Sequence, residues 1–370
     1  MRTLTLVGAH QLRPEWDELV RLEKEDRHPR ASFFNRELET ELLNERCLDR
    51  APAFRRTLYR TMPVWTSQLV EALAIARRYD AVISWNEKIG IPFAALQKAR
   101  GVRMPHVGIF SWISKPKTSR LLSLAQSHFD AIILMSSVQR EHAASVLGIP
   151  EEKVPLLRWP VDTAFWRPMP QASTDMICSV GREMRDYETL IRAAAPTGIR
   201  LHIAANIVQG KHDPWIDTLR DAQSRYPLIT AGKKDFCALR ELYARSRFLV
   251  MPVLSTDTDN GSTSILEAMA MGKPVICSKT KGQVDIIEHG KTGLFVPVND
   301  ERAMREAIEY LWNNPDVAER MGRAALEHAR QYHKLEDWVS RVKSIVESAI
   351  ERHAVRPASH THTTQPRLAQ

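Results

Sequence analysis

The sequence predicts an α/β protein with two mostly parallel domains. Strand-like runs of apolar residues alternate with helical segments, which is the pattern of successive βαβ units. The chain has 370 residues, 44% of them hydrophobic, and this exceeds the length at which one hydrophobic core usually suffices. Pro168 and Pro170 precede a polar stretch, residues 171–175, and therefore place the domain boundary near residue 168.

The first domain, residues 1–168, is expected to contain four strands. Each is a short apolar run, and helical segments separate one run from the next. The expected strands are Thr3–Gly8, Ala81–Ser84, His106–Phe110 and Ala131–Met135. In a parallel sheet such strands are buried on both faces, so they read as continuous apolar runs.

The second domain, residues 169–334, is expected to contain four more strands, followed by two helices with acidic starts at 301–312 and 316–332. The expected strands are Ile177–Val180, Leu201–Ala205, Phe248–Val253 and Val275–Ser278. One more helix is expected at 335–353. Residues 354–370 are polar and rich in Thr, His and Pro, which predicts a disordered tail.

The cysteines and the start of the chain favour a cytoplasmic protein. Cys47, Cys178, Cys237 and Cys277 are far apart and show no paired spacing, which is typical of buried thiols rather than of disulfides or metal ligands. The apolar run after Met1 is too short for a signal peptide, and no apolar stretch is long enough to span a bilayer.

The net charge of +8 is unevenly distributed. Residues 51–125 hold twelve Lys or Arg against three Asp or Glu, with Trp65, Trp85 and Trp112 between them. The cations of interest are Arg55, Arg56, Arg60, Lys115 and Lys117. A basic face with aromatic anchors suits docking on the inner face of an anionic membrane or binding of an anionic acceptor, and solubility is an equal alternative. No nucleic-acid-binding motif is present, so no nucleic-acid partner is expected.

Residues 257–278 carry the strongest functional signal. A polar turn, Asp259-Asn-Gly-Ser-Thr-Ser264, leads into a short apolar helix, Ile265–Met271, which stops at Gly272. Such a turn directs backbone N–H groups and the positive end of a helix at one point, which suits a phosphate. Two carboxylates, Asp259 and Glu267, bracket this anion site.

The same residues also allow purely structural interpretations. Ser264 and Glu267 fit the spacing of a capping box, and Asp259-Asn-Gly fits an ordinary turn. Asp257 and Asp259 resemble a D-x-D metal motif, but no His or third carboxylate lies near enough in sequence to complete a Mg²⁺ or Mn²⁺ shell. We therefore expect no metal cofactor.

The wider block resembles the retaining glycosyltransferases of the GT-B fold, the family 4 group (glycosyl transferases group 1). The residues that carry the resemblance are Glu267-Ala-Met-Ala-Met-Gly-Lys-Pro-Val275, Gly282, and Asp285 through Pro297, with Met321-Gly-Arg-Ala-Ala325 further on. It spans at least residues 176–345. The resemblance implies two Rossmann-like domains with a cleft between them, an acceptor-side first domain, a donor-side second domain, and a crossover helix at 335–353 that returns to the first domain.

The resemblance also implies a donor site for a nucleoside-diphosphate sugar. The strand ending in Gly181-Arg182 and the nearby Arg185 would hold the donor phosphates, together with the amides of Asn260, Gly261, Ser262, Thr263 and Ser264. A solvated charge at a helix start is the equal alternative for Arg185. Glu267 would accept from both ribose hydroxyls, and Asp259, where the family usually has Glu, from the donor sugar. The implied reaction is transfer of the sugar to an acceptor hydroxyl with retention of anomeric configuration.

The acceptor side departs from the family pattern. Only one glycine, Gly8, follows the first strand, and Ser111-Trp112 stands where a His is frequent. His10 and His106 are more typical of structural residues. The acceptor, whether a glycan, a lipid-linked glycan or a small molecule, is therefore left open. The alternatives to transfer are an epimerase-like sugar-nucleotide enzyme of the same fold and a noncatalytic nucleotide-binding partner protein; the presence of both Asp259 and Glu267 favours transfer.

Overall fold

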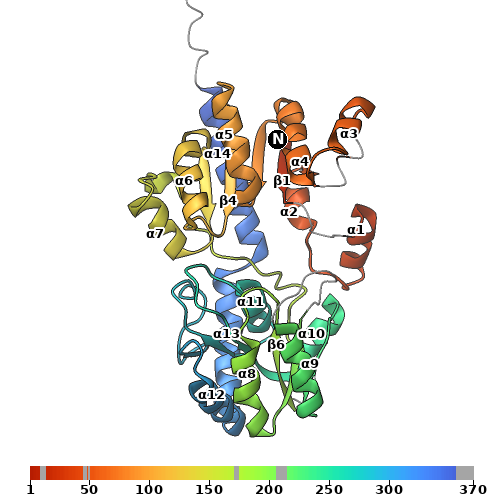
Figure 1. Cartoon of the computed structure of the whole chain (residues 1–370), viewed down its shortest axis with the longest axis vertical. Coiled ribbons are helices and arrows are strands. Elements are labelled where there is room, and N and C mark those ends of the chain that lie inside the picture. The colour runs from red at the N-terminus through yellow and green to blue at the C-terminus, as the bar shows by residue number, and fades with distance from the viewer. Residues whose placement is uncertain (9–13, 45–47, 49–50, 171–174, 206–214, 356–370) are drawn as a thin grey trace, which may run out of the picture.

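The computed structural model describes residues 1–8, 14–44, 48, 51–170, 175–205 and 215–355. The chain forms two units stacked along the long axis of the molecule, each built on one parallel β-sheet with helices around it (Figure 1). The predicted α/β class with two mostly parallel domains is confirmed. Most of the predicted tail, residues 356–370, lies outside the described residues.

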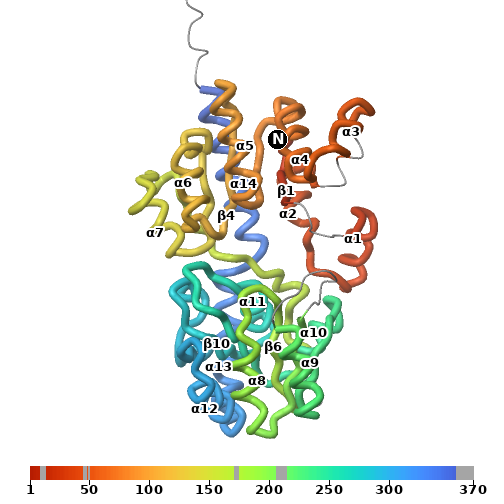
Figure 2. The backbone as a smooth tube through the Cα atoms, viewed as in Figure 1, coloured from red at the N-terminus to blue at the C-terminus, as the bar shows by residue number. Residues whose placement is uncertain are grey.

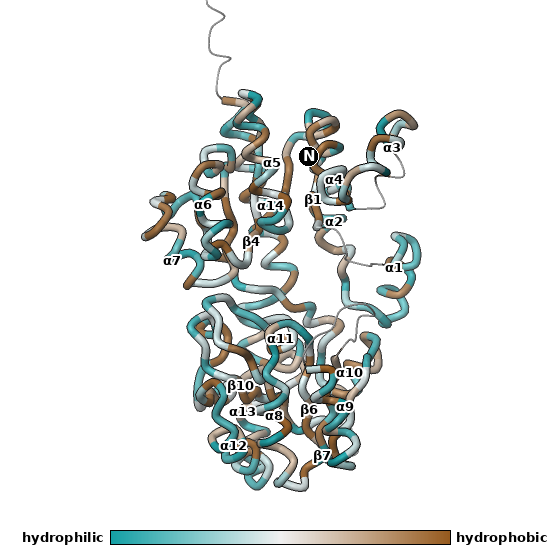
Figure 3. Tube along the Cα trace, in the orientation of Figure 1, coloured by the Kyte–Doolittle hydropathy of each residue, from teal (hydrophilic) through white to brown (hydrophobic). Residues whose placement is uncertain are grey.

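The first sheet has the strand order β2-β1-β3-β4-β5, and neighbouring strands are parallel. Its strands are β1 (Thr3–Val7), β2 (Thr40–Leu43), β3 (Ala81–Trp85), β4 (His106–Phe110) and β5 (Ala131–Leu134). The apolar character of β1 and β4 is visible in Figure 3. The strand order reverses between β1 and β3, so the carboxyl ends of these two strands border the point where ligands bind in such sheets.

Helices cover both faces of the first sheet. Those of this part of the chain are α1 (Trp16–Lys24), α2 (Phe33–Glu37), α3 (Ala53–Tyr59), α4 (Val64–Ile75), α5 (Glu87–Ala99), α6 (Pro116–Ala125) and α7 (Ser137–Ser145). Leu69 of α4 and Phe93 of α5 pack against Leu4 and Val82 on one face. The other face packs against α2 and against α14 (Leu335–Ala354), whose Trp338, Val342 and Val346 join the core around Ile83 and Val107.

The second sheet has the order β11-β10-β9-β6-β7-β8, again parallel throughout. Its strands are β6 (Met176–Val180), β7 (Arg200–Ala204), β8 (Ile229–Ala231), β9 (Ser246–Met251), β10 (Val275–Ser278) and β11 (Gly293–Val296). The order reverses between β9 and β6. The loops that follow these two strands, 181–186 and 252–261, therefore meet at one edge of the sheet.

The second sheet is also covered on both faces. Its helices are α8 (Tyr187–Ala194), α9 (Trp215–Arg225), α10 (Phe236–Arg245), α11 (Ser262–Ala270), α12 (Glu301–Asn313) and α13 (Pro315–Tyr332). Residues of α10, α11 and α13 share one core cluster, and residues of α8, α9 and α12 share the other. Within the described residues, no helix combines the length and the apolar character needed to cross a bilayer.

All eight predicted strands are present, each with ends within two residues of the prediction. Strands β2, β8 and β11 were not predicted. The three predicted helices of the carboxyl-terminal part correspond to α12, α13 and α14.

Two segments connect the domains, and they run side by side. Val161 N–H donates to His333 O at 2.7 Å, and Leu335 N–H donates to Val161 O at 3.2 Å. The first segment comes after α7 and leads to β6, and the second enters α14, so the tube in Figure 2 passes between the domains in both directions. The paired backbones form a short two-stranded connection.

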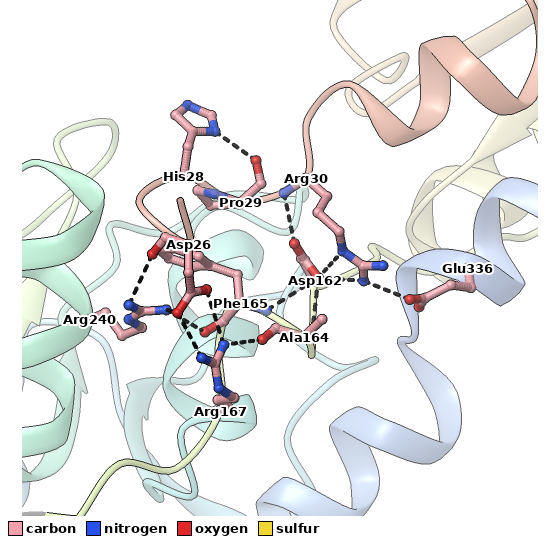
Figure 4. A network of polar contacts seen from close by, with 10 residues as sticks. All are labelled: Asp26, His28, Pro29, Arg30, Asp162, Ala164, Phe165, Arg167, Arg240 and Glu336. Carbon is pink, nitrogen blue, oxygen red and sulfur yellow. Dashed lines mark hydrogen bonds and ion pairs between the residues drawn. The ribbon is translucent and has the colours of Figure 1, made fainter. Parts of the chain in front are cut away.

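A polar network ties the segment after α1 to this connection (Figure 4). Arg30 Nη2 lies 2.6 Å from Asp162 Oδ1 and 2.6 Å from Glu336 Oε1, and the Arg30 amide donates to Asp162 Oδ2 at 2.7 Å. Asp26 pairs with Arg167 at 2.7 Å and with Arg240 of α10 at 3.0 Å. Residues 26–30 of the first domain therefore contact the connection, α14 and the second domain.

Candidate functional site

The predicted donor residues meet where β6 and β9 end. Helix α11 begins at Ser262, with Gly261 as its N-cap at a φ of 93°, and no side chain caps it. The predicted start at Ile265 is therefore wrong by three residues: Ser262, Thr263 and Ser264 form the first turn of the helix rather than a turn before it. A glycine fits the N-cap position because other residues rarely adopt this backbone conformation.

The structure excludes the capping-box interpretation of Glu267. Ser264 lies in the first turn of α11 and is not the N-cap. The Glu267 carboxylate instead accepts a hydrogen bond from the Tyr243 hydroxyl of α10 at 2.9 Å. Only 7% of Glu267 is exposed, and burial raises the pKa of its carboxyl to about 8. The sequence did not single out Tyr243, because only the packing of α10 on α11 brings it to Glu267.

Asp259 lies just before α11 and is also 7% exposed. Its Oδ2 accepts from Ser262 Oγ at 3.2 Å, and its Oδ1 accepts from Thr258 Oγ1 at 3.3 Å. Burial raises the pKa of Asp259 to about 6, although its hydrogen bonds partly oppose this shift. Both predicted carboxylates are thus held in fixed positions near the start of one helix.

Arg185 is a buried cation at this helix start. It is 7% exposed, so the alternative of a solvated charge is wrong. Its Nε donates to Val180 O at 3.1 Å and its Nη1 to Glu183 O at 2.6 Å. A Cβ atom placed on Gly181 would lie 2.4 Å from Arg185 Nη2, and one on Gly261 would lie 3.2 Å from it. The guanidinium therefore sits directly against both glycines, and burial lowers its pKa.

Gly181 and Arg182 complete the loop after β6. Gly181 has a φ of 104° and begins the turn that returns Arg185 to the site. Arg182 is half-buried beside it. The backbone of Gly181 is itself hydrogen-bonded, to Ala204 O through its N–H and to the Tyr187 hydroxyl through its carbonyl. The loop therefore offers an anion the side chains of Arg182 and Arg185 rather than the Gly181 amide.

The loop that carries Asp259 and Asn260 is fixed by the segment after β10. Gln283 Nε2 donates to Asn260 O at 2.5 Å, and Asn260 Nδ2 donates to Thr256 Oγ1 at 3.1 Å. A Cβ atom on Gly282 would lie 2.2 Å from Thr258 O, so only glycine allows this approach of the two backbones. Gln283 is a second contributor that sequence reasoning missed.

The same loop touches the first domain at the segment after β4. Thr258 Oγ1 donates to Ser111 O at 3.0 Å, and Trp112 Nε1 donates to Asp257 Oδ1 at 2.9 Å. Gln139 of α7 donates to Asp257 O at 2.8 Å. Asp257 and Asp259, the two acids of the D-x-D pattern, therefore have different partners: Asp257 accepts from Trp112 of the first domain, whereas Asp259 accepts from its neighbours Thr258 and Ser262.

The loops after β1 and β3 meet at the point where the strand order of the first sheet reverses. Asn86 follows β3 with a φ of 142°, a strained conformation for a residue other than glycine. A Cβ atom on Gly8 would lie 3.2 Å from Asn86 Nδ2. His106 is fully buried in β4, 2.7 Å from Ser84 Oγ, and burial lowers its pKa to about 3. His106 is thus a core residue, and His10 lies outside the described residues.

Residues 177–328, which include Gly181, Arg185, Asp259 and Glu267, match the model of a protein family described as glycosyl transferases group 1. This part of the chain is therefore similar to the glycosyl transferases group 1 domain. The match supports the resemblance to glycosyl transferases group 1 over these residues, and retention of configuration stays a prediction.

Curated relatives match parts of the chain. It is 44% identical over 69 residues to D-rhamnosyltransferase WbpZ of Pseudomonas aeruginosa, a match that spans 18% of each protein. It is 27% identical over 237 residues to the GDP-mannose-dependent α-(1-6)-phosphatidylinositol monomannoside mannosyltransferase of Mycobacterium tuberculosis, spanning 58% of this chain and 61% of the relative. The chain thus matches less than two thirds of the length of either relative.

Solved structures share the fold over almost the whole length of this chain. HepE of Anabaena, solved in complex with UDP, is similar with a TM-score of 0.69 at 16% identity, covering 94% of this chain and all of that chain. At this identity the likeness concerns the fold alone. The predicted GT-B fold is confirmed.

Proposed function

We propose that the protein is a glycosyltransferase that moves a sugar from a nucleoside-diphosphate sugar to an acceptor hydroxyl with retention of anomeric configuration. The observation that carries the proposal is the position of the Arg185 guanidinium against Gly261 at the start of α11, which has no side-chain cap. A buried cation and a helix N-terminus directed at one point favour a bound anion. The glycosyl transferases group 1 domain supports transfer as the reaction.

Each donor contact has a candidate residue. The diphosphate would lie between Arg185, Arg182 and the first amides of α11, where these groups stabilise the charge that develops on the leaving nucleoside diphosphate. Glu267 would accept hydrogen bonds from the ribose hydroxyls while it holds Tyr243, because a carboxylate has several acceptor positions. Asp259 would accept from hydroxyls of the donor sugar.

The proposed chemistry requires no metal ion, since protein cations and helix amides supply the electrostatic stabilisation. Retention follows if the acceptor hydroxyl attacks on the face that the diphosphate leaves. The acceptor would then approach from the first domain, beside the segment after β4 that touches the Asp257–Asp259 loop.

Binding of nucleotides tests the proposal first. Thermal shift with a panel of nucleoside diphosphates and their sugar conjugates should show stabilisation by at least one nucleotide, because a ligand that binds only the folded state raises the melting temperature. Isothermal calorimetry then gives the affinity. The control is Glu306→Gln, which changes a surface carboxylate of α12 that pairs with Arg302.

Turnover distinguishes transfer from the two alternatives. A sugar nucleotide that is hydrolysed slowly to nucleoside diphosphate, and faster with an acceptor, supports a transferase. Interconversion of two sugar nucleotides without release of nucleoside diphosphate would identify an epimerase-like enzyme. Nucleotide binding with neither reaction would identify a noncatalytic partner protein.

The proposal extends to contact with an anionic membrane through α3 and the start of α4. Phe54 and Leu58 of α3 are 75% and 52% exposed, and Trp65 of α4 is 56% exposed. Arg56 and Arg60 are exposed on the same short segment, which lies at the outer side of the first domain in Figure 1. Apolar and aromatic side chains interspersed with cations suit the interface of an anionic bilayer.

Three of the five cations that the sequence placed on the membrane face lie outside it, and one of them, Lys117, belongs to α6 rather than to α3 or α4. Arg55 is not available there, since its Nε lies 3.0 Å from Glu71 Oε2 and it is 18% exposed. Lys115 lies over the Trp112 ring, at the contact with the second domain. The membrane face is therefore narrower than expected.

Vesicle sedimentation tests the membrane contact. Wild-type protein should sediment with anionic phosphatidylserine vesicles at low salt and less at higher salt, because the Debye length shortens. Changing Phe54, Leu58 and Trp65 to Ser should release the protein, whereas Lys117→Gln, an exposed change in α6, should not. Wild-type protein that stays in the supernatant at both salt concentrations would contradict the contact.

A further inference from the structure

Lys115 occupies a defined position at the junction of the two domains. Its Nζ lies 3.5 Å from the centroid of the Trp112 ring, a cation–π contact. The same indole donates its Nε1–H to Asp257 Oδ1 at 2.9 Å. Lys115 is the N-cap of α6, and Pro116 follows it as the first helical residue, so the backbone on its carboxyl side is rigid as well.

The ammonium group of Lys115 is partly desolvated and forms no ion pair with any residue that the structure describes. Burial lowers its pKa. Three carboxylates at longer range, Glu87, Glu183 and Asp257, raise its pKa, and Lys88 lowers it. Within the described residues, none of these carboxylates forms an ion pair with Nζ. Arg55, in the same basic stretch, differs because it has Glu71 as a partner. A desolvated cation without a partner favours binding of an anion.

The surroundings of Lys115 place this anion beside the donor site. Glu183 belongs to the loop after β6, directly after Arg182, and Asp257 is two residues before Asp259. Lys115 itself comes from the first domain, on the side that the acceptor would approach. The donor phosphates have Arg185 and the start of α11 in the second domain. Lys115 is therefore in a position to bind an anionic group other than the donor phosphates.

We infer that Lys115 binds a phosphate or carboxylate group of the acceptor, held over Trp112, and that the acceptor is therefore an anionic molecule. This inference rests on the proposed glycosyltransferase function. Lys115 would orient the acceptor so that its hydroxyl faces the sugar held by Asp259. Because Trp112 is bonded to Asp257, it fixes the Lys115 ammonium relative to the loop 252–261, which we call the donor loop.

The indole N–H signal of Trp112 offers a local readout by NMR, assigned with Trp112→Phe. The protein is first saturated with the nucleoside diphosphate selected by thermal shift, so that the donor phosphate site is filled. Inorganic phosphate and glycerol 3-phosphate are then titrated, with glycerol as the uncharged control. We expect a saturable shift of the Trp112 signal with both anions and none with glycerol.

Two variants decide whether Lys115 is the receptor. Lys115→Gln should weaken phosphate binding about tenfold, because a charge-assisted hydrogen bond is lost. Lys117→Gln removes an exposed cation two residues away and should leave the titration unchanged. Melting temperatures show whether each variant is folded. No saturable shift in wild-type protein, or equal shifts in wild type and Lys115→Gln, would overturn the inference.

Calorimetry separates the acceptor from the donor as the source of the anion. If Lys115→Gln binds phosphate as tightly as wild type but binds the nucleoside diphosphate more weakly, Lys115 contacts the donor and the acceptor assignment is wrong. If no nucleoside diphosphate binds wild-type protein, the proposed function fails. The same phosphate titration of the ligand-free protein then still decides whether Lys115 binds an anion.

Discussion

The Tyr243 hydroxyl donates to Oε2 of Glu267 at 2.9 Å, and this bond joins α10 to α11 beneath the donor loop. Both side chains are buried. The bond orients a carboxylate that would otherwise be free to rotate in an apolar environment, and it leaves acceptor positions for a ligand. Glu267 is thus held in place before any nucleotide binds.

Glu267→Ala should weaken binding of the nucleoside-diphosphate sugar by about 2–3 kcal/mol, since hydrogen bonds to a charged group are lost. Isothermal calorimetry on folded protein measures this, with Glu306→Gln as the control on a distant helix. If the affinity for the nucleoside-diphosphate sugar did not change, Glu267 would have only a structural role, as the hydrogen-bond partner of Tyr243.

The stability of the ligand-free protein should fall as pH rises from about 4.5 through about 8. Burial raises the pKa of Glu267 from 4.5 to about 8, so between these values the folded state keeps a proton that the unfolded state has released. Glu267→Gln lacks this titration, and its melting temperature should rise relative to wild type as pH increases. If the melting temperatures of the two proteins changed with pH in parallel, the raised pKa of Glu267 would be contradicted.

Nucleotide binding should tighten over the same pH range. Ribose hydroxyls donate to the ionised form of Glu267, so the ligand favours loss of its proton. Calorimetry in buffers of different ionisation enthalpy should detect proton release near neutral pH. Glu267→Gln should show no such release, and release of equal size in that variant would assign the proton to another group.

Gly181→Ala should abolish nucleotide binding. A Cβ atom there would lie 2.4 Å from Arg185 Nη2, so the guanidinium must leave the position that it occupies beside Gly261. Gly290→Ala is the matched control, because Gly290 also has a positive φ but nothing lies within 4 Å of an added Cβ. Both variants should lose about 1–3 kcal/mol of stability from backbone strain. Equal nucleotide affinity in the two variants would exclude Arg185 from the donor site.

Turnover should survive EDTA, because Arg182, Arg185 and the amides of α11 offset the charge of the leaving diphosphate. The measurement is the initial rate before and after chelation. Loss of activity that Mn²⁺ or Mg²⁺ restores would contradict this expectation. Asp257→Asn would then test whether the D-x-D pair supplies the metal ligands.

The strands that the sequence predicted are those with long apolar runs. Strands β2, β8 and β11 were not predicted; each has at most four residues and is only partly buried, unlike the fully buried β5 and β10. The start of α11 was missed for a related reason. Its first turn, Ser262–Ser264, is polar, and the apolar pattern begins only at Ile265.

The residues of the candidate site also fall into two groups, those that the sequence alone indicated and those that only the structure revealed. Asp259, Glu267 and Arg185 lie on local patterns that a sequence displays directly. Tyr243, Gln283 and Trp112 act through contacts between segments far apart in the chain, and no local pattern indicates these contacts. The sequence marked Trp112 only as an aromatic residue of the basic stretch and as a departure from the family pattern. Their positions depend on the packing of α10, on the loop after β10 and on the contact between the domains.

The bond pattern around Asp162 limits how the protein can move. Asp162 accepts from Arg30, and its neighbour Val161 is bonded to the backbone on both sides of Lys334. A change in the angle between the two sheets must therefore bend both connecting segments together at this point. The separation of Lys115 from Glu183 would change with that angle. A small molecule that displaced Arg30 from Asp162 would thus act on the reaction from outside the site, without resembling either substrate.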